Sequence, residues 1–208
     1  AEISPAFDQI ALATEALSVP PSGVVTMTTE STIAQKWLVP RLGALKSRHP
    51  EIELKLSVAP QLMDIEAHDF DIGLRYLRDD PPPEYDLLLP SRVRAYAAPR
   101  FAPFKNGELD LAALARGPLI VDATFRFWAD WFEKAGLADI PDLKLPHPLA
   151  ALLAVQSAVA GLGAVLMDAN LCEPELMAKT LEQISPVEIH YGGYYLALNS
   201  RAARRKNV

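Results

Sequence analysis

Cysteine, histidine and long apolar runs are all scarce in this sequence, and each scarcity excludes a class of protein. The single cysteine, Cys172, excludes an internal disulfide and a metal site built from several thiolates. The four histidines are far apart in sequence, and none has a partner at the helical spacing of a zinc site. No apolar run reaches the roughly 18 residues that a membrane span needs, and the N-terminus does not resemble a signal peptide. We therefore expect no metal, no cofactor and no membrane, and a lone cysteine is typical of the cytoplasm.

Catalytic motifs and an excess of positive charge are also lacking. The sequence has no Walker loop and no serine elbow. Gly161 and Gly163 follow a predicted helix, which indicates a helix stop rather than a nucleotide-binding turn. The formal net charge is −6, which gives no generic attraction to the phosphates of DNA. We therefore expect that the chain is not an enzyme and does not bind DNA by itself.

The sequence does contain two series of alternating strand-like and helix-like segments. Half of its 208 residues are apolar, enough for one large domain or two small lobes. A β-α-β order predicts a parallel sheet with helices on its faces, and two series predict two α/β lobes with a cleft between them. Pro40 predicts a jog between two helical segments. The predicted strands are residues 24–28, 52–58, 71–76, 93–98, 119–121 and 164–167, and the predicted helices are residues 31–37, 40–48, 62–68, 109–114, 127–135 and 149–160.

Hydroxyl groups gather where the first predicted strand ends and a helix begins. Thr29, Ser31 and Thr32 lie there. Ligands of parallel α/β sheets bind beyond the carboxyl ends of strands, and helix N-termini favour anions. The alternative is that Ser31 or Thr32 only caps the helix. Both interpretations stay open.

Two other predicted strands also end in polar loops. Thr124, Phe125 and Trp128 follow the strand at residues 119–121, and aromatic side chains beside polar groups suit a small-molecule pocket. The alternative for Trp128 is that it belongs to the core together with the aromatic residues that follow it. Asp168 follows the strand at residues 164–167 and is either a site residue or only the cap of the next helix.

Five segments of this sequence form a familiar series. They are AQKWLVPRL at 34–42 with RHPEI at 48–52, DIGLRY at 71–76, LLLP at 87–90, VAGLGAV at 159–165 and YYL at 194–196. In order and spacing they resemble the effector-binding domain of LysR-type transcriptional regulators, in the branch of the glycine-cleavage and β-lactamase activators. Residues 1–19 resemble the end of the family's linker helix. The family's winged helix-turn-helix is not in the sequence, so we expect a part of a longer regulator.

The resemblance implies two Rossmann-like lobes, similar to type 2 periplasmic binding proteins, with an effector between them. Lobe I would be residues 23–90 plus 197–208, lobe II residues 91–196, and residues 1–22 a linker. It also implies a homodimer or homotetramer that contacts DNA only through the N-terminal domain. The rival is a free-standing solute-binding receptor of the same fold, which gel filtration would show as a monomer. The residues expected to contact a polar or anionic effector are Thr29, Ser31 and Thr32 on lobe I, Thr124, Phe125 and Trp128 on lobe II, and Gln61 and Asp168 at the rim.

Overall fold

The chain folds into two compact units. The computed structural model describes residues 23–59, 64–78, 81–99 and 101–199. Internal contacts assign Ala1–Pro90 and Gly192–Val208 to unit 1, and Ser91–Tyr191 to unit 2. Unit 2 is therefore one continuous stretch of chain inserted into unit 1. The lobe bounds expected from the sequence stay a prediction.

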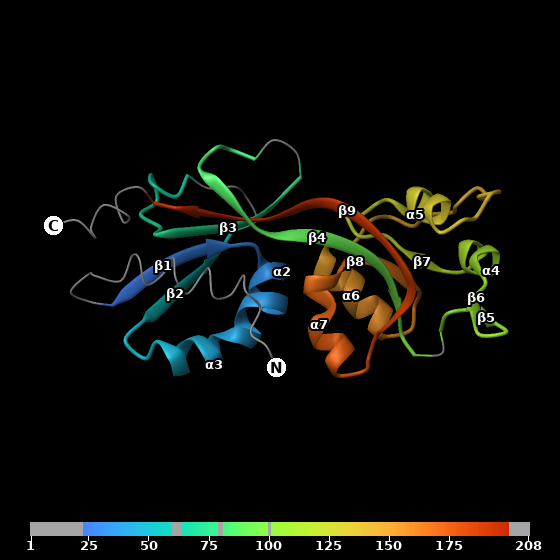
Figure 1. The fold of residues 1–208 in the computed structure, drawn as a ribbon, viewed down its shortest axis with the longest axis horizontal. Coiled ribbons are helices and arrows are strands. Elements are labelled where there is room, and N and C mark those ends of the chain that lie inside the picture. The colour runs from blue at the N-terminus through green and yellow to red at the C-terminus, as the bar shows by residue number, and fades with distance from the viewer. Residues whose placement is uncertain (1–22, 60–63, 79–80, 100, 200–208) are drawn as a thin grey trace. The chain divides into compact units, whose positions relative to one another are not determined.

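Unit 1 is a sheet accompanied by one long, interrupted helix. Thr29 of β1 pairs with Val58 of β2 and with Leu74 of β3, both in parallel register, so all three strands end at the same edge. Figure 1 shows these three strands side by side with the helical segment next to them. The elements are β1 (Val24–Thr29), α2 (Ser31–Ile33), the π-helical turn η1 (Ala34–Leu38), α3 (Val39–Arg48), β2 (Glu53–Val58), β3 (Ile72–Leu77), the start of β4 (Tyr85–Ala97) and the end of β9 (Glu182–Leu198).

The jog predicted at Pro40 takes the form of the π-helical turn. Proline has no N–H, and Pro40 lies in the first turn of α3, where no such donor is needed. Just before it, the N–H of Val39 bonds to the carbonyl oxygen of Ala34, which is the five-residue spacing of a π-helix. Trp37 is 3% exposed, and the guanidinium of Arg41 lies 5.0 Å from its ring centroid. The helix is thus fixed by its buried face and by this cation–π contact.

Unit 2 contains both parallel and antiparallel pairs of neighbouring strands. β7 pairs with β8 in parallel, with Leu119 opposite Ala164, and β8 pairs with β4 in antiparallel, with Asp168 opposite Val93. β7 is the edge strand in this order. The elements are the rest of β4 and β9, the hairpin β5 (Phe104–Lys105) and β6 (Glu108–Leu109), α4 (Leu111–Arg116), β7 (Leu119–Ile120), α5 (Trp128–Lys134), α6 (Ala151–Val159), β8 (Ala164–Asp168) and α7 (Ala169–Met177).

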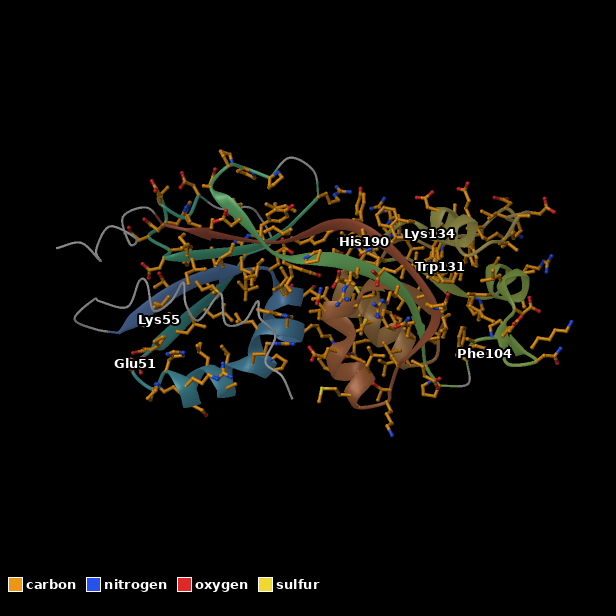
Figure 2. The ribbon with its side chains drawn as sticks, viewed as in Figure 1. Glu51, Lys55, Phe104, Trp131, Lys134 and His190 are labelled. Carbon is orange, nitrogen blue, oxygen red and sulfur yellow. The ribbon has the colours of Figure 1, made fainter. Side chains whose placement is uncertain are left out.

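An aromatic cluster on α5 forms part of the core of unit 2. Trp128, Trp131 and Phe132 are each 0% exposed, and their ring centroids lie 5.4–5.6 Å apart. Figure 2 shows Trp131 and Lys134 on α5, where Lys134 is exposed. Burial of three large rings on one face explains why this short helix is stable.

The sheet differs from the sequence prediction in the length and direction of two strands. The strand predicted at residues 93–98 is the second part of β4, which has 13 residues, and β9 has 17. Both contain residues that disfavour strands, namely Pro90 in β4 and Gly192 with Gly193 in β9, so the sequence pattern divided them. The parallel pairs expected from the β-α-β order are present, but β3 with β9 and β4 with β8 pair antiparallel, so the sheet is mixed. In the described part of the chain, no helix is long and apolar enough to cross a membrane.

Candidate functional site

β1 ends in two adjacent threonines whose hydroxyl groups have different surroundings. Thr28 and Thr29 are both 0% exposed. The hydroxyl oxygen of Thr28 accepts a hydrogen bond of 2.8 Å from Nη2 of Arg75. The hydroxyl of Thr29 has no hydrogen-bond partner among the described residues. A buried hydroxyl without a partner is unfavourable, so Thr29 has hydrogen-bonding capacity that the described residues do not use.

The helix that follows β1 begins without a side-chain cap. Glu30 is the N-cap residue, and its side chain makes no capping hydrogen bond. The first helical bond runs from the N–H of Ala34 to the carbonyl oxygen of Glu30, at 2.9 Å. Ser31 is exposed and Thr32 is half-buried, and both lie inside the first turn rather than at the cap position. The simple capping alternative therefore does not describe either residue, and the N–H groups of this turn can receive acceptors from solvent or a ligand.

Two opposite charges lie beside these threonines. Arg75 is 1% exposed, and burial lowers the pKa of its guanidinium, while the charge of Glu30 opposes that shift. Burial also raises the pKa of Glu30, and the charge of Arg75 and the N–H of Tyr76 oppose this. The charges of Arg75 and Glu30 therefore partly compensate each other at the strand ends of β1 and β3.

In unit 2, a buried carboxyl group organises the loop after β7. Oδ1 of Asp122 accepts hydrogen bonds from the backbone N–H groups of Thr124, at 2.8 Å, and Phe125, at 2.9 Å. Burial raises the pKa of Asp122, and these hydrogen bonds oppose the rise. Oδ2 of Asp122 is buried without a hydrogen-bond partner among the described residues. Asp122 thus fixes the position of Thr124, which is half-buried.

The two aromatic residues expected at this loop are buried. Phe125 is 2% exposed and Trp128 is 0% exposed. The indole N–H of Trp128 donates to the carbonyl oxygen of Ile120 at 2.9 Å, so its only polar group is satisfied within unit 2. This matches the core alternative for Trp128 and not a position on a pocket wall.

Asp168 acts as the cap of α7. Oδ1 accepts the N–H of Asn170 at 2.7 Å, and Oδ2 accepts the hydroxyl of Ser91 and the N–H of Arg92. Asp168 is 0% exposed, and burial raises the pKa of its carboxyl group against these hydrogen bonds. Its oxygens are already engaged, so the structure matches the capping alternative for this residue.

The structure places five of the expected residues at one strand-end loop in each unit. Thr29, Ser31 and Thr32 share the end of β1 in unit 1, and Thr124 with Phe125 share the loop after β7 in unit 2. Gln61 lies outside the described residues. Within the described residues, no cluster of histidine, cysteine and acidic side chains could hold a metal ion.

Three polar side chains at these loops were not among the expected site residues: Glu30, Arg75 and Asp122. Each lies at or next to the end of a predicted strand, and this position in the sequence could have identified them as candidates. Only the structure shows that Arg75 and Asp122 are buried there.

Comparisons with known proteins identify regulators. The chain is 30% identical over 174 residues to the HTH-type transcriptional regulator PerR of Escherichia coli K12, covering 81% of this chain and 57% of PerR. It is 26% identical over 208 residues to the glycine cleavage system transcriptional activator of the same strain, covering 97% of this chain and 67% of the activator. The chain thus spans a little over half the length of PerR.

Solved structures agree in fold. The effector domain of the regulator AmpR from Pseudomonas aeruginosa superposes with a TM-score of 0.68 at 26% identity, covering 86% of each chain. The AmpR effector binding domain from Citrobacter freundii gives a TM-score of 0.70 at 21% identity, covering 88% of this chain and 93% of that one. The LysR substrate binding domain family matches residues 18–208, and the chain therefore belongs to this family.

Proposed function

We propose that this chain is the effector-sensing part of a LysR-type transcriptional regulator, which binds a small polar or anionic molecule and thereby controls transcription by a longer protein. Its family membership supports this, since the curated relatives are transcriptional regulators and not enzymes. The observation that carries the proposal is the end of β1, where the buried Thr29 hydroxyl, which has no partner among the described residues, adjoins a helix N-terminus without a side-chain cap.

In unit 1, the proposed ligand contacts are Thr29, Ser31 and Thr32. A carboxylate or similar acceptor would receive the first-turn N–H groups and the Ser31 hydroxyl, because the N-terminal end of a helix carries partial positive charge. Gln61, proposed at the rim, follows β2, whose strand ends at the same edge as β1.

In unit 2, the proposed ligand contact is Thr124. Asp122 holds its backbone N–H, and the side chain of Thr124 is half-buried beside the Asp122 carboxyl group. Phe125 and Trp128 are proposed as residues that support this loop from the core, because their side chains are buried. Asp168 stays proposed at the rim, where its side chain caps α7.

Screening polar metabolites for a rise in melting temperature of this chain would find an effector, since a ligand that binds only the folded state stabilises it.

Calorimetry of Ser31→Ala and Thr124→Ala then tests each loop separately. Loss of a hydrogen bond to a charged group weakens binding by about 10- to 150-fold. Ser47→Ala is the matched control, because Ser47 is an exposed helical serine that bonds only to the carbonyl oxygen of Gly43. If both variants bind like the control, the proposed site is wrong. If only Ser31→Ala weakens binding, the unit 2 part of the site is wrong.

We also propose that the regulator assembles as a homodimer or homotetramer through unit 1. β2 is the edge strand of its sheet order, and Val58 at its end is 51% exposed, as is Val39 at the start of α3 with 50%. Exposed apolar residues on such elements favour a partner surface. Light scattering should give a dimer that Val58→Asp weakens and that Met177→Asp leaves intact, since Met177 is an exposed apolar residue of unit 2, with 76% exposure. A monomer at high concentration would contradict the proposal.

DNA binding is proposed to belong to another part of the longer protein. The acidic charge of this chain supports that division. A gel-shift assay at low salt should show no retardation of duplex DNA by this chain alone, and specific retardation would overturn this part of the proposal.

A further inference from the structure

A cavity of about 420 Å³ lies at the outer edge of unit 2. One wall consists of residues 117–121, which include β7. β7 is the edge strand of the sheet in unit 2. The opposite wall comes from residues 144–149, an extended segment that lies before α6. Ser157 of α6 and Leu162 of the turn after it complete the cavity. Its volume is within the range of about 300–1,000 Å³ that small-molecule sites occupy.

The walls of the cavity are preformed. The N–H of Leu149 donates to the carbonyl oxygen of Val121 at 2.8 Å, and the carbonyl oxygen of Leu149 accepts the N–H of Ala123 at 2.8 Å. Pro146 and Pro148 restrict the backbone of the same segment. A wall that is already ordered loses little conformational entropy when a ligand binds.

The cavity is distinct from the proposed effector site. Thr124, Phe125, Trp128 and Asp168 do not line it. It lies along the outer side of β7, whereas Thr124 belongs to the loop beyond the end of that strand.

Its chemistry is apolar with a single permanent positive charge at the edge. Leu119, Ile120 and Leu162 are among its apolar residues, and Leu162 is 64% exposed. Lys144 is exposed and has no ion pair or hydrogen bond among the described residues. No acidic side chain is among the described residues that line the cavity. This is a local contrast with a chain whose formal charge is −6.

We propose that this cavity is a second ligand site, for a small amphipathic monoanion with an apolar body and one carboxylate. The apolar body lies against Leu119 and Leu162, and the carboxylate meets the ammonium group of Lys144. His147 adds a second polar group, since Nδ1 lies 3.1 Å from the carbonyl oxygen of Pro148 and Nε2 on the far side of the ring is left for a ligand. One lysine offers charge for one carboxylate, so a dianion gains little over a monoanion.

Octanoate is a suitable probe, with 1-octanol and octylammonium as neutral and cationic analogues. Calorimetry with this chain should rank octanoate above octanol and octylammonium last. In ¹H–¹⁵N spectra, octanoate should shift the amide signals of the non-proline residues in 117–121, 144–149 and 157–162 and leave those of residues 29–32 unchanged. Binding only to other residues, or no binding at millimolar concentration, would overturn the proposal.

Two variants test the charge and the location. Lys144→Gln should weaken octanoate by about 3- to 10-fold at low salt, because the contact is exposed and partly screened, and should leave octanol unchanged. Lys134→Gln is the matched control, since Lys134 is an exposed lysine of the same unit that does not line the cavity (Figure 2). Ser157→Trp should fill the cavity and abolish binding of both ligands. If Lys144→Gln binds octanoate like Lys134→Gln, the anionic class of ligand is wrong, and if the folded Ser157→Trp variant still binds, the location is wrong.

Discussion

The two adjacent threonines at the end of β1 form a matched pair for mutagenesis. Both are fully buried in the same strand, but the hydroxyl of Thr28 accepts a hydrogen bond from Arg75, whereas that of Thr29 has no partner among the described residues. Valine has nearly the shape of threonine and replaces the hydroxyl with a methyl group. Thr28→Val and Thr29→Val therefore make the same chemical change with opposite expected effects on stability.

The expected magnitudes follow from these surroundings. Thr29→Val removes a buried polar group that makes no bond, so it should raise the free energy of unfolding by about 1–2 kcal/mol. Thr28→Val removes a hydrogen bond to a charged guanidinium, so it should lower the free energy of unfolding by about 1.5–3 kcal/mol. At about 2–4 °C per kcal/mol for a chain of this size, the melting temperature should rise by about 2–8 °C for Thr29→Val and fall by about 3–12 °C for Thr28→Val.

Thermal and urea unfolding followed by circular dichroism would measure both changes. If Thr29→Val lowers stability as much as Thr28→Val does, the Thr29 hydroxyl has a bonding partner in solution and the reasoning is refuted. The proposed function adds a second readout, because Thr29→Val should weaken binding of an identified effector while it stabilises the free protein. A stabilised variant with unchanged effector affinity would show that Thr29 is not a ligand contact.

Three further changes test other parts of the structure. Burial raises the pKa of Glu188, but the hydrogen bond and charge of Arg94 outweigh it and hold this pKa below its ordinary value. Glu188→Gln should therefore lower the free energy of unfolding by about 0.5–1 kcal/mol at pH 7. In urea unfolding, this difference from wild type should disappear as the pH falls below the ordinary glutamate pKa of about 4.3. A constant difference down to pH 2 would contradict this. Trp128→Phe leaves the carbonyl oxygen of Ile120 without its donor and should lower the free energy of unfolding by about 2–3 kcal/mol, so unchanged stability would argue against the buried position. Gly192→Ala should lower the melting temperature in calorimetry, because Gly192 has a φ of +68° and an added Cβ would meet a backbone carbonyl oxygen at the end of β3; a neutral result would contradict the described backbone of β9 at this residue.

Strands with clean alternation were predicted well from the sequence, and interrupted strands were not. The alternation from Ile52 to Val58 appears as β2 within one residue. Leu54 and Leu56 are half-buried while Glu53 and Lys55 are exposed, but Val58 breaks the pattern and is exposed. β9 could not be predicted at its full length, because Gly192 and Gly193 interrupt the apolar pattern. Gly192 is needed at a positive φ, and Gly193 packs too closely against Leu87 and Leu89 to carry a side chain. Only tertiary contacts explain why the strand continues through these residues.

The candidate site was predicted by position along the chain but not by the role of each residue. Strand ends identified the loops at Thr29 and Thr124, because ligands of α/β sheets bind there. Sequence spacing could not distinguish a buried ring such as Trp128 from an exposed one at the first turn of a helix. It also could not show that the hydrogen-bond capacity of Asp168 is used by Ser91, since these two residues are far apart in the chain.

The insertion of unit 2 into unit 1 fixes the order in which the chain can fold during synthesis. β3 pairs with β9, from Ile72 opposite Leu198 to Leu77 opposite Gly193, so this edge of β3 has no partner until all of unit 2 has been translated. Unit 2 needs only residues 91–191 and can fold first, whereas unit 1 must keep a strand edge open in the meantime. Open edges pair readily with other chains. A nascent chain that has emerged from the ribosome as far as Tyr191 should therefore carry a folded unit 2 and an incomplete unit 1 that chaperones bind, and release should coincide with the emergence of the last strand.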